Sequence, residues 1–241
     1  MRRANAVGRR TETWERKRRL VPLESRVVQL AAGAGHRCVG LIVRGGLRFG
    51  PRLAPLWVLL SRSGFMQHFT FPSQFSALYD KAVGLYAKGR RGADTFFSAD
   101  EIAFLAANGV TPQHMYDYAE DHNGYAGEPG PVHALAIELV RRDYFLNGQG
   151  GQPSRVVLDE AKLPAKTDTV RGIAWLPRLL PKARAKLRGE LPPSLMYCCG
   201  GDRKFFKEHN ILPSEFLALV WRHEKNDAAI VDWVVRRSGT R

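Results

Sequence analysis

The residues best suited to covalent chemistry are two adjacent cysteines, Cys198 and Cys199, which are followed by two glycines and Asp202. Aspartate is a favoured N-cap residue, so we predict that a helix begins at Arg203. Backbone N–H groups and the helix dipole at such a start can lower the pKa of a thiol or bind an anion. The pattern therefore raises the possibility of a nucleophilic or redox thiol.

A second interpretation of the two thiols is structural, because cysteine commonly packs as a small buried apolar residue. We prefer this interpretation, since the sequence shows no complete catalytic set around them. If they do react, His209 or His223 is the candidate base. Adjacent cysteines lack the two-residue spacer of zinc sites, so we predict no metal site and no cofactor.

One amphipathic helix precedes the cysteines and carries a row of basic side chains. Apolar residues recur at helical spacing on one side, at positions 176, 179, 180, 183 and 187. The other side holds Arg178, Lys182 and Lys186, with Arg184 and Arg188 at its flank. We predict that the leucine side is buried and that the basic side faces solvent.

The basic side of this helix also suggests which kind of ligand the protein binds. The predicted ligand-binding set is Arg178, Lys182, Arg184, Lys186 and Arg203, and the expected ligand is a small anion or an acidic protein. The alternative is a solvated face balanced by carboxylates at Glu190, Asp202, Glu208 and Glu215. No aromatic residues interleave with the basic ones, which argues against a nucleic-acid partner.

A third cluster combines histidine with carboxylates. His114, Asp117 and Asp121 fall on one side of a predicted helix, at a spacing that can present metal ligands or an acid–base pair. No standard metal-binding motif accompanies them. We therefore interpret them as solvated residues near a helix end.

The net charge of +14 is distributed very unevenly along the 241 residues. Residues 1–65 hold fourteen lysines and arginines but three acidic residues, so the remaining chain is close to neutral. For this segment we favour an upstream extension, with Met66 as the true first residue. A disordered basic tail and an organelle transit segment are the alternatives. The longest apolar run, residues 53–60, is too short to cross a membrane.

The remaining pattern predicts a mostly α fold without an extended sheet. Start and stop signals predict helices over residues 73–88, 98–107, 111–121 and 131–146, and after residue 170 four more, including the basic helix and those starting near residues 203, 212 and 226. In the fourth helix, Val132, Leu135, Ala136, Leu139 and Val140 are expected to face the core. We predict a basic extension at 1–65, a helical region at 66–150, a linking strap at 151–170, extended at most around 156–158, and a C-terminal helical domain at 171–241.

Four segments together resemble a bacterial family known as domain of unknown function 5069. They are residues 171–178, 182–189, 196–203 and 227–233, and the resemblance covers about 163–238. One departure is Pro181, where family members often have an aspartate; it predicts a kink, or a helix that begins there. The resemblance implies a helical fold and a cytoplasmic setting, and it carries no established activity.

Two functions remain open on these grounds. The first, which we prefer, is a non-catalytic binding or adaptor module that uses the basic helix. The second is a thiol-dependent enzyme centred on Cys198 and Cys199 that acts on an anionic substrate. Few cysteines and no disulfide framework favour the cytoplasm for either. A pocket containing Cys199 beside Arg178 or Lys182 would favour the enzyme, and buried thiols would favour the module.

Overall fold

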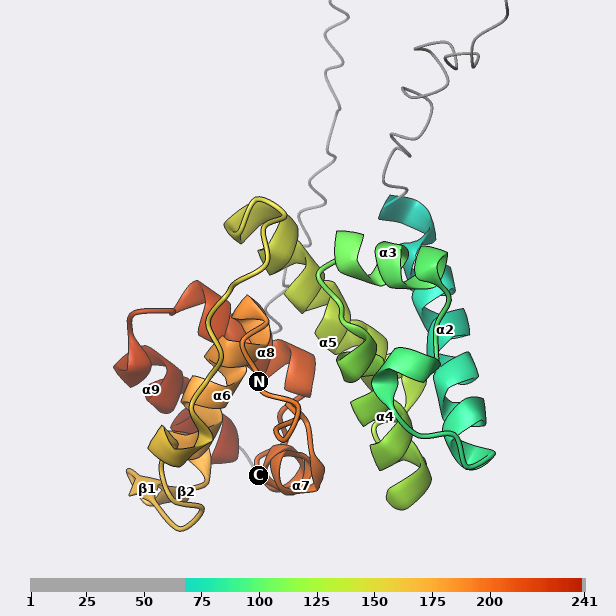
Figure 1. Ribbon diagram of the computed structural model, residues 1–241. Helices are drawn as coiled ribbons and strands as arrows, with labels where there is room; N and C mark the ends of the chain where they lie inside the picture. Colours follow the sequence, from blue (N-terminus) through green and yellow to red (C-terminus); the bar gives the residue numbers. More distant parts are fainter. Residues whose placement is uncertain (1–67, 240–241) are drawn as a thin grey trace, which may run out of the picture. The chain divides into compact units, whose positions relative to one another are not determined.

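A computed structural model describes residues 68–239 (Figure 1). The predictions for the basic segment 1–65 and for Met66 lie outside the described residues. Within the described part, no helix is both long and apolar enough to cross a membrane. The described residues contain eight α-helices and a single two-stranded hairpin, which confirms the mostly α fold.

Four α-helices come before the strap. They are α2 (Phe71–Ala87), α3 (Ala99–Ala107), α4 (Pro112–Gly124) and α5 (Pro131–Asp143), with short 3-10 turns η1 (His68–Thr70) and η2 (Ala93–Thr95). The start signal of α3 is a capping box, in which the Ser98 side chain accepts from the Glu101 N–H and the Glu101 carboxylate accepts from the Ser98 N–H. Thr111 caps α4 as predicted. Ser73 does not cap α2, since Pro72 lies in the first turn and the Ser73 hydroxyl donates to the Thr70 carbonyl.

Four further α-helices follow the strap. The strap itself holds the 3-10 turn η4 (Glu160–Lys162) and leads into an antiparallel hairpin of β1 (Thr169–Val170) and β2 (Ile173–Ala174). After it come α6 (Leu176–Arg188), α7 (Gly200–Glu208), α8 (Pro213–Arg222) and α9 (Asp227–Ser238). The hairpin was not predicted, because two residues per strand are too few to leave an alternating pattern.

Helix α5 lies between α2, α3 and α4 on one side and α6 and α8 on the other (Figure 1). Its residues belong to two hydrophobic clusters. The first lies among α2, α3 and α4 and includes Ala134 of α5. The second lies among α6, α7, α8 and α9 and includes Ile137 of α5 and Tyr144. Tyr144 belongs to a π-helical turn, η3 (Tyr144–Gly148), which continues α5. The predicted boundary between the helical regions 66–150 and 171–241 stays a prediction.

The apolar side of α5 that was expected to face the core is only partly buried: Leu135 and Val140 pack against the hydrophobic clusters, but two other members do not. Val132 is 76% exposed and Leu139 is 41% exposed, whereas the buried residues include Ala134, Ile137 and Glu138. The apolar count misled here because α5 buries charged side chains that find partners in the interior. Of the apolar side, Val132 and Leu139 stay in contact with water.

Helix α6 confirms half of its prediction and contradicts the other half. Its leucines are buried in the second cluster, as expected. Lys182 and Lys186, however, are only 2% and 3% exposed, so the basic side is not the solvent face we predicted. The helix begins at Leu176 with Pro181 inside it, which excludes a start near Pro181. A helix packed on two sides buries the side chains of both, and a lysine side chain tolerates burial only beside a counter-ion.

Candidate functional site

The carboxylate of Asp202 lies at the centre of a buried polar cluster where α7 begins. Its Oδ2 accepts from Lys182 Nζ at 2.7 Å and from the Cys198 backbone N–H at 2.8 Å. Its Oδ1 accepts from the Trp175 indole N–H at 3.0 Å. Asp202 has no exposed surface. The helix begins at Gly200 with Cys199 as its N-cap residue, so the predicted capping role of Asp202 is wrong and the carboxylate serves as a counter-ion.

Lys182 remains charged in this cluster. Burial alone would lower the pKa of its ammonium, but the opposing charge of Asp202, the nearby Cys199 and their hydrogen bonds raise it overall. Lys182 Nζ also lies 3.1 Å from Cys199 Sγ. One lysine thus ties the middle of α6 to the first turn of α7.

Gly201, the second of the two adjacent glycines, allows close packing against Trp175. A Cβ atom on Gly201 would lie 2.4 Å from Cζ2 of Trp175. The indole therefore needs glycine at position 201 to approach the helix and donate to Asp202. The backbone of Trp175 adopts the left-handed conformation, with φ of 68°. Trp175 directly precedes Leu176, the first residue of α6.

The two cysteines have different surroundings. Cys198 is buried, and burial together with the charge of Asp202 raises the pKa of its thiol to about 12. It is therefore a neutral thiol at physiological pH and a poor nucleophile. Cys199 is partly exposed, and within residues 68–239 neither cysteine forms a disulfide.

A second buried ion pair lies one turn further along α6. Lys186 Nζ donates to Glu138 Oε1 at 2.5 Å, and the Tyr118 hydroxyl donates to the same oxygen at 2.8 Å. Burial favours the neutral form of Glu138, but Lys186, His114 and Tyr118 outweigh it and lower the pKa of the carboxyl overall. This pair joins α4, α5 and α6, and no local sequence pattern marks Glu138 or Tyr118 as a polar partner of Lys186.

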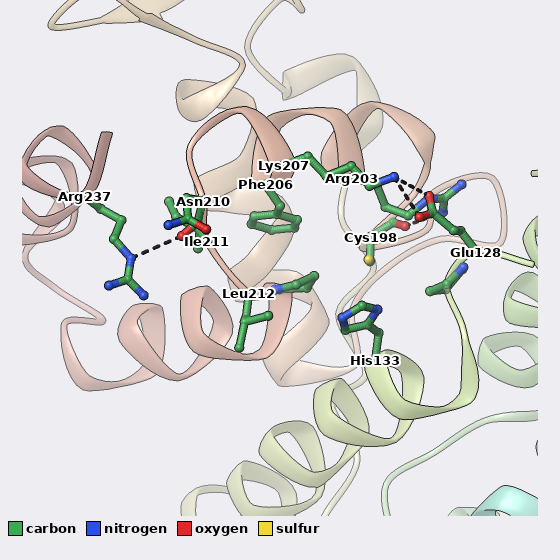
Figure 2. A pocket seen from close by; sticks show the side chains of 12 residues that line it. Glu128, His133, Cys198, Arg203, Phe206, Lys207, Asn210, Ile211, Leu212 and Arg237 are labelled. Atoms are coloured by element: carbon green, nitrogen blue, oxygen red, sulfur yellow. Dashed lines mark hydrogen bonds and ion pairs between the residues drawn. The ribbon is translucent and has the colours of Figure 1, made fainter. Parts of the chain in front are cut away.

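A pocket of about 560 Å³ opens beside this polar interior (Figure 2). Its apolar lining includes Phe206, Ile211 and Pro213, all of which are buried. Three cationic side chains and one carboxylate also line it: Arg203, Lys207, Arg237 and Glu128. The remaining lining residues are Pro129, His133, Cys198, Asn210 and Leu212.

Arg203 holds one wall of the pocket in place. Its Nη1 donates to Asp121 Oδ2 at 2.6 Å and to the Cys198 carbonyl at 2.7 Å. Its guanidinium also lies over the Tyr125 ring, 5.2 Å from the ring centre. Lys207 donates to both oxygens of Glu128, at 2.7 and 2.8 Å, and lowers the pKa of that carboxyl. The loop before α5 is thereby fixed against α7.

A protein-family model matches the part of the chain that contributes most residues of this site. Residues 162–241 match the family model DUF5069, a domain of unknown function. No curated protein and no solved structure matches the chain. The DUF5069 segment contains Lys182, Asp202 and both cysteines, whereas Glu138 and Tyr118 lie before it.

Within the DUF5069 segment, the arginines of α6 also find acceptors. Arg178 donates to the Pro164 carbonyl and to Glu160, Arg184 pairs with Asp227, and Arg188 pairs with Glu190. With Lys182 and Lys186 buried, the predicted anion-binding side is largely occupied by the protein's own carboxylates. Arg203 alone of the predicted ligand-binding set lines the pocket.

The histidines predicted to take part in chemistry are placed apart. His114 is the N3 residue of the α4 capping box, where its Nδ1 accepts from the Thr111 N–H, and burial lowers the pKa of its imidazole to about 3. Burial raises the pKa of Asp117 to about 7, so this side chain is not the solvated carboxylate we expected. In the DUF5069 segment, the His209 ring packs on Phe205 and its Nδ1 lies 2.7 Å from the Ser238 hydroxyl. No group of three possible metal ligands occurs among residues 68–239.

Proposed function

We propose that the protein is a non-catalytic binding module that takes a small organic anion with an apolar body into the pocket beside Arg203. The observation that supports this best is the pairing of a buried apolar wall with a mainly cationic rim in one concavity. Such pockets bury the apolar part of a ligand and orient it by a few polar groups. The free thiols suit the reducing cytoplasm that we propose as its location.

The pocket replaces the basic side of α6 as the proposed anion site. Lys182 and Lys186 already neutralise Asp202 and Glu138, so a ligand would have to break a buried ion pair to reach them. Lys207, by contrast, lies at the rim, and its partner Glu128 is also partly exposed. An incoming carboxylate can therefore approach Lys207 and His133 without disturbing the interior.

A thermal-shift screen of the full chain with octanoate and octanol tests this function. We expect octanoate to raise the melting temperature more than octanol, because the two share an apolar body and differ in charge. Lys207→Met should weaken octanoate binding about tenfold, the loss of one charge-assisted contact. Lys204→Met is the matched control, since Lys204 lies on the same helix and does not line this pocket. Absence of any shift at millimolar ligand, or an equal loss in the control, would contradict the proposal.

The thiol-dependent enzyme stays a second candidate on one specific observation. Cys199 is partly exposed at the first turn of α7, and Lys182 Nζ lies 3.1 Å from its sulfur. A neighbouring ammonium and a helix start are the surroundings that activate thiols. The buried, neutral Cys198 does not share this character.

Alkylation by iodoacetamide at neutral pH, mapped by peptide mass spectrometry, separates the two functions. The binding module predicts that Cys198 stays unlabelled in the native state and that Cys199 labels no faster than free cysteine. A Cys198→Ala/Cys199→Ala variant should fold and provides the background. Labelling of Cys199 faster than free cysteine, and slowed by Lys182→Gln in a variant that remains folded, would favour the enzyme.

A further inference from the structure

The strap between η3 and the hairpin lies against the outside of α6 and its C-terminal end (Figure 1). Two contacts fix its middle: the Ser154 hydroxyl donates to Glu190 Oε1 at 2.8 Å, and the Leu158 N–H donates to the Glu190 carbonyl at 2.7 Å. The segment 155–159, here called the edge segment, contains neither helix nor turn. It contains residues 156–158, around which the sequence predicted at most a short extended piece.

Within residues 68–239, the backbone N–H groups on one side of the edge segment form hydrogen bonds, and those on the other side do not. The Val156 N–H donates to the Ser154 hydroxyl and the Leu158 N–H to Glu190, so both point toward the body of the protein. In an extended chain, successive N–H groups point to opposite sides. In that conformation the N–H and C=O of Val157 point away from Glu190, and no hydrogen bond to either group is found within residues 68–239.

The side chains of the edge segment are unusually apolar for an exposed strap. Val156 is 61% exposed and Val157 is 66% exposed. Consecutive β-branched residues favour strand pairing, and an open strand edge that lacks proline and a bulge is a template for another strand. The neighbouring charges, Arg155 and Asp159, stand at the two ends of the segment rather than at its centre.

We propose that the edge segment pairs antiparallel with the edge segment of a second copy of this chain. Centred on Val157, the sequence Arg-Val-Val-Leu-Asp is self-complementary under a two-fold axis. Val157 meets Val157 of the second copy, Val156 meets Leu158, and Arg155 of each copy lies opposite Asp159 of the other. The charge pairing selects this register, because a shift by two residues would leave both pairs unmatched.

The hydrogen bonds available fit this register. The two Val157 residues exchange two N–H···O=C bonds, and the Asp159 N–H of each copy donates to the Arg155 carbonyl of the other. The Asp159 carbonyl is already used by the Lys162 N–H, so pairing ends there. A pairing this short buries less surface than the roughly 1,000 Å² of stable interfaces, so the dimer is weak and concentration-dependent.

Sedimentation equilibrium of the full chain from about 10 µM to 1 mM tests the pairing. We expect self-association that Val157→Pro abolishes, because proline removes the outward N–H while no hydrogen bond within residues 68–239 is lost. Val157→Ala, which keeps this N–H, should still associate. A monomer across the whole range, or a Val157→Pro protein that associates as the natural chain does, would overturn the proposal.

A charge exchange tests the register. Arg155→Asp places like charges opposite each other in its own dimer, and so does Asp159→Arg. Each variant alone is expected to be monomeric, whereas an equimolar mixture restores both ion pairs and forms a heterodimer. Asp159 also caps η4 through the Ala161 N–H, so the melting temperature of each variant is measured first. If Asp159→Arg is unfolded, Asp159→Asn replaces it and should weaken association. Failure of the folded pair to associate on mixing would refute this register.

Discussion

Lys182→Met is expected to lower the free energy of unfolding by about 3–5 kcal/mol, the cost of removing one partner from a buried ion pair. Methionine fills nearly the same volume as the lysine stem, so packing changes little. The loss comes from Asp202, whose charge would remain without exposure to water. Its remaining donors, the Cys198 N–H and the Trp175 indole, are neutral. Urea unfolding followed by circular dichroism measures the difference.

The control for this variant is Lys204→Met on the neighbouring helix. Lys204 is exposed, and its one ion pair among residues 68–239 is with Glu208 at 3.8 Å, so its replacement should change stability by less than about 0.5 kcal/mol. A loss of the same size in Lys182→Met and in the Lys204→Met control would contradict our interpretation.

Local signals predicted the helix boundaries well, because capping depends on residues close in sequence. Ser98, Thr111 and Asn226 accept from backbone N–H groups at the starts of α3, α4 and α9, as their types and positions indicate. The leucine side of α6 was also predictable from its spacing. These features follow from interactions within a single turn or a single helix.

The burial of the lysines was not predictable by the same reasoning. Helical spacing groups Lys182 with Lys186, but it does not reveal that each faces a carboxylate 20 and 48 residues away in sequence. Asp202 resembled an N-cap, and Glu138 stood among residues that suggested an apolar side. Charge on a helix side therefore indicated solvent, although the fold supplies counter-ions from α7 and α5.

The pocket was hidden from sequence reasoning for a related reason. Its lining comes from the loop before α5, from α7 and the link to α8, and from Arg237 near the chain's end. No local motif marks this combination. Arg203 was identified because it stands next to Asp202 and the cysteines, although its partners, Asp121 and the Cys198 carbonyl, could not be foreseen.

Glu138→Ala is expected to cost about 3–5 kcal/mol of unfolding free energy, because it leaves the buried Lys186 ammonium without its carboxylate. The Tyr118 hydroxyl would lose its acceptor as well. The natural pair also predicts acid sensitivity: the pKa of Glu138 is lowered on folding. Its contribution is therefore complete above the unfolded value of about 4.3 and declines as the pH falls toward the lower folded value.

A double-mutant cycle separates the ion pair from the packing around it. Glu138→Leu and Lys186→Met each leave one buried charge unpaired, whereas the double variant leaves none. The double variant should therefore be more stable than the sum of the single losses predicts, by about 2–3 kcal/mol, the upper end for contacting residues. Glu120→Leu combined with Lys186→Met serves as the reference cycle, since Glu120 is exposed and bonds Tyr86. A coupling below about 0.5 kcal/mol for Glu138 and Lys186 would mean that α4, α5 and α6 are joined by apolar contacts rather than by this buried pair.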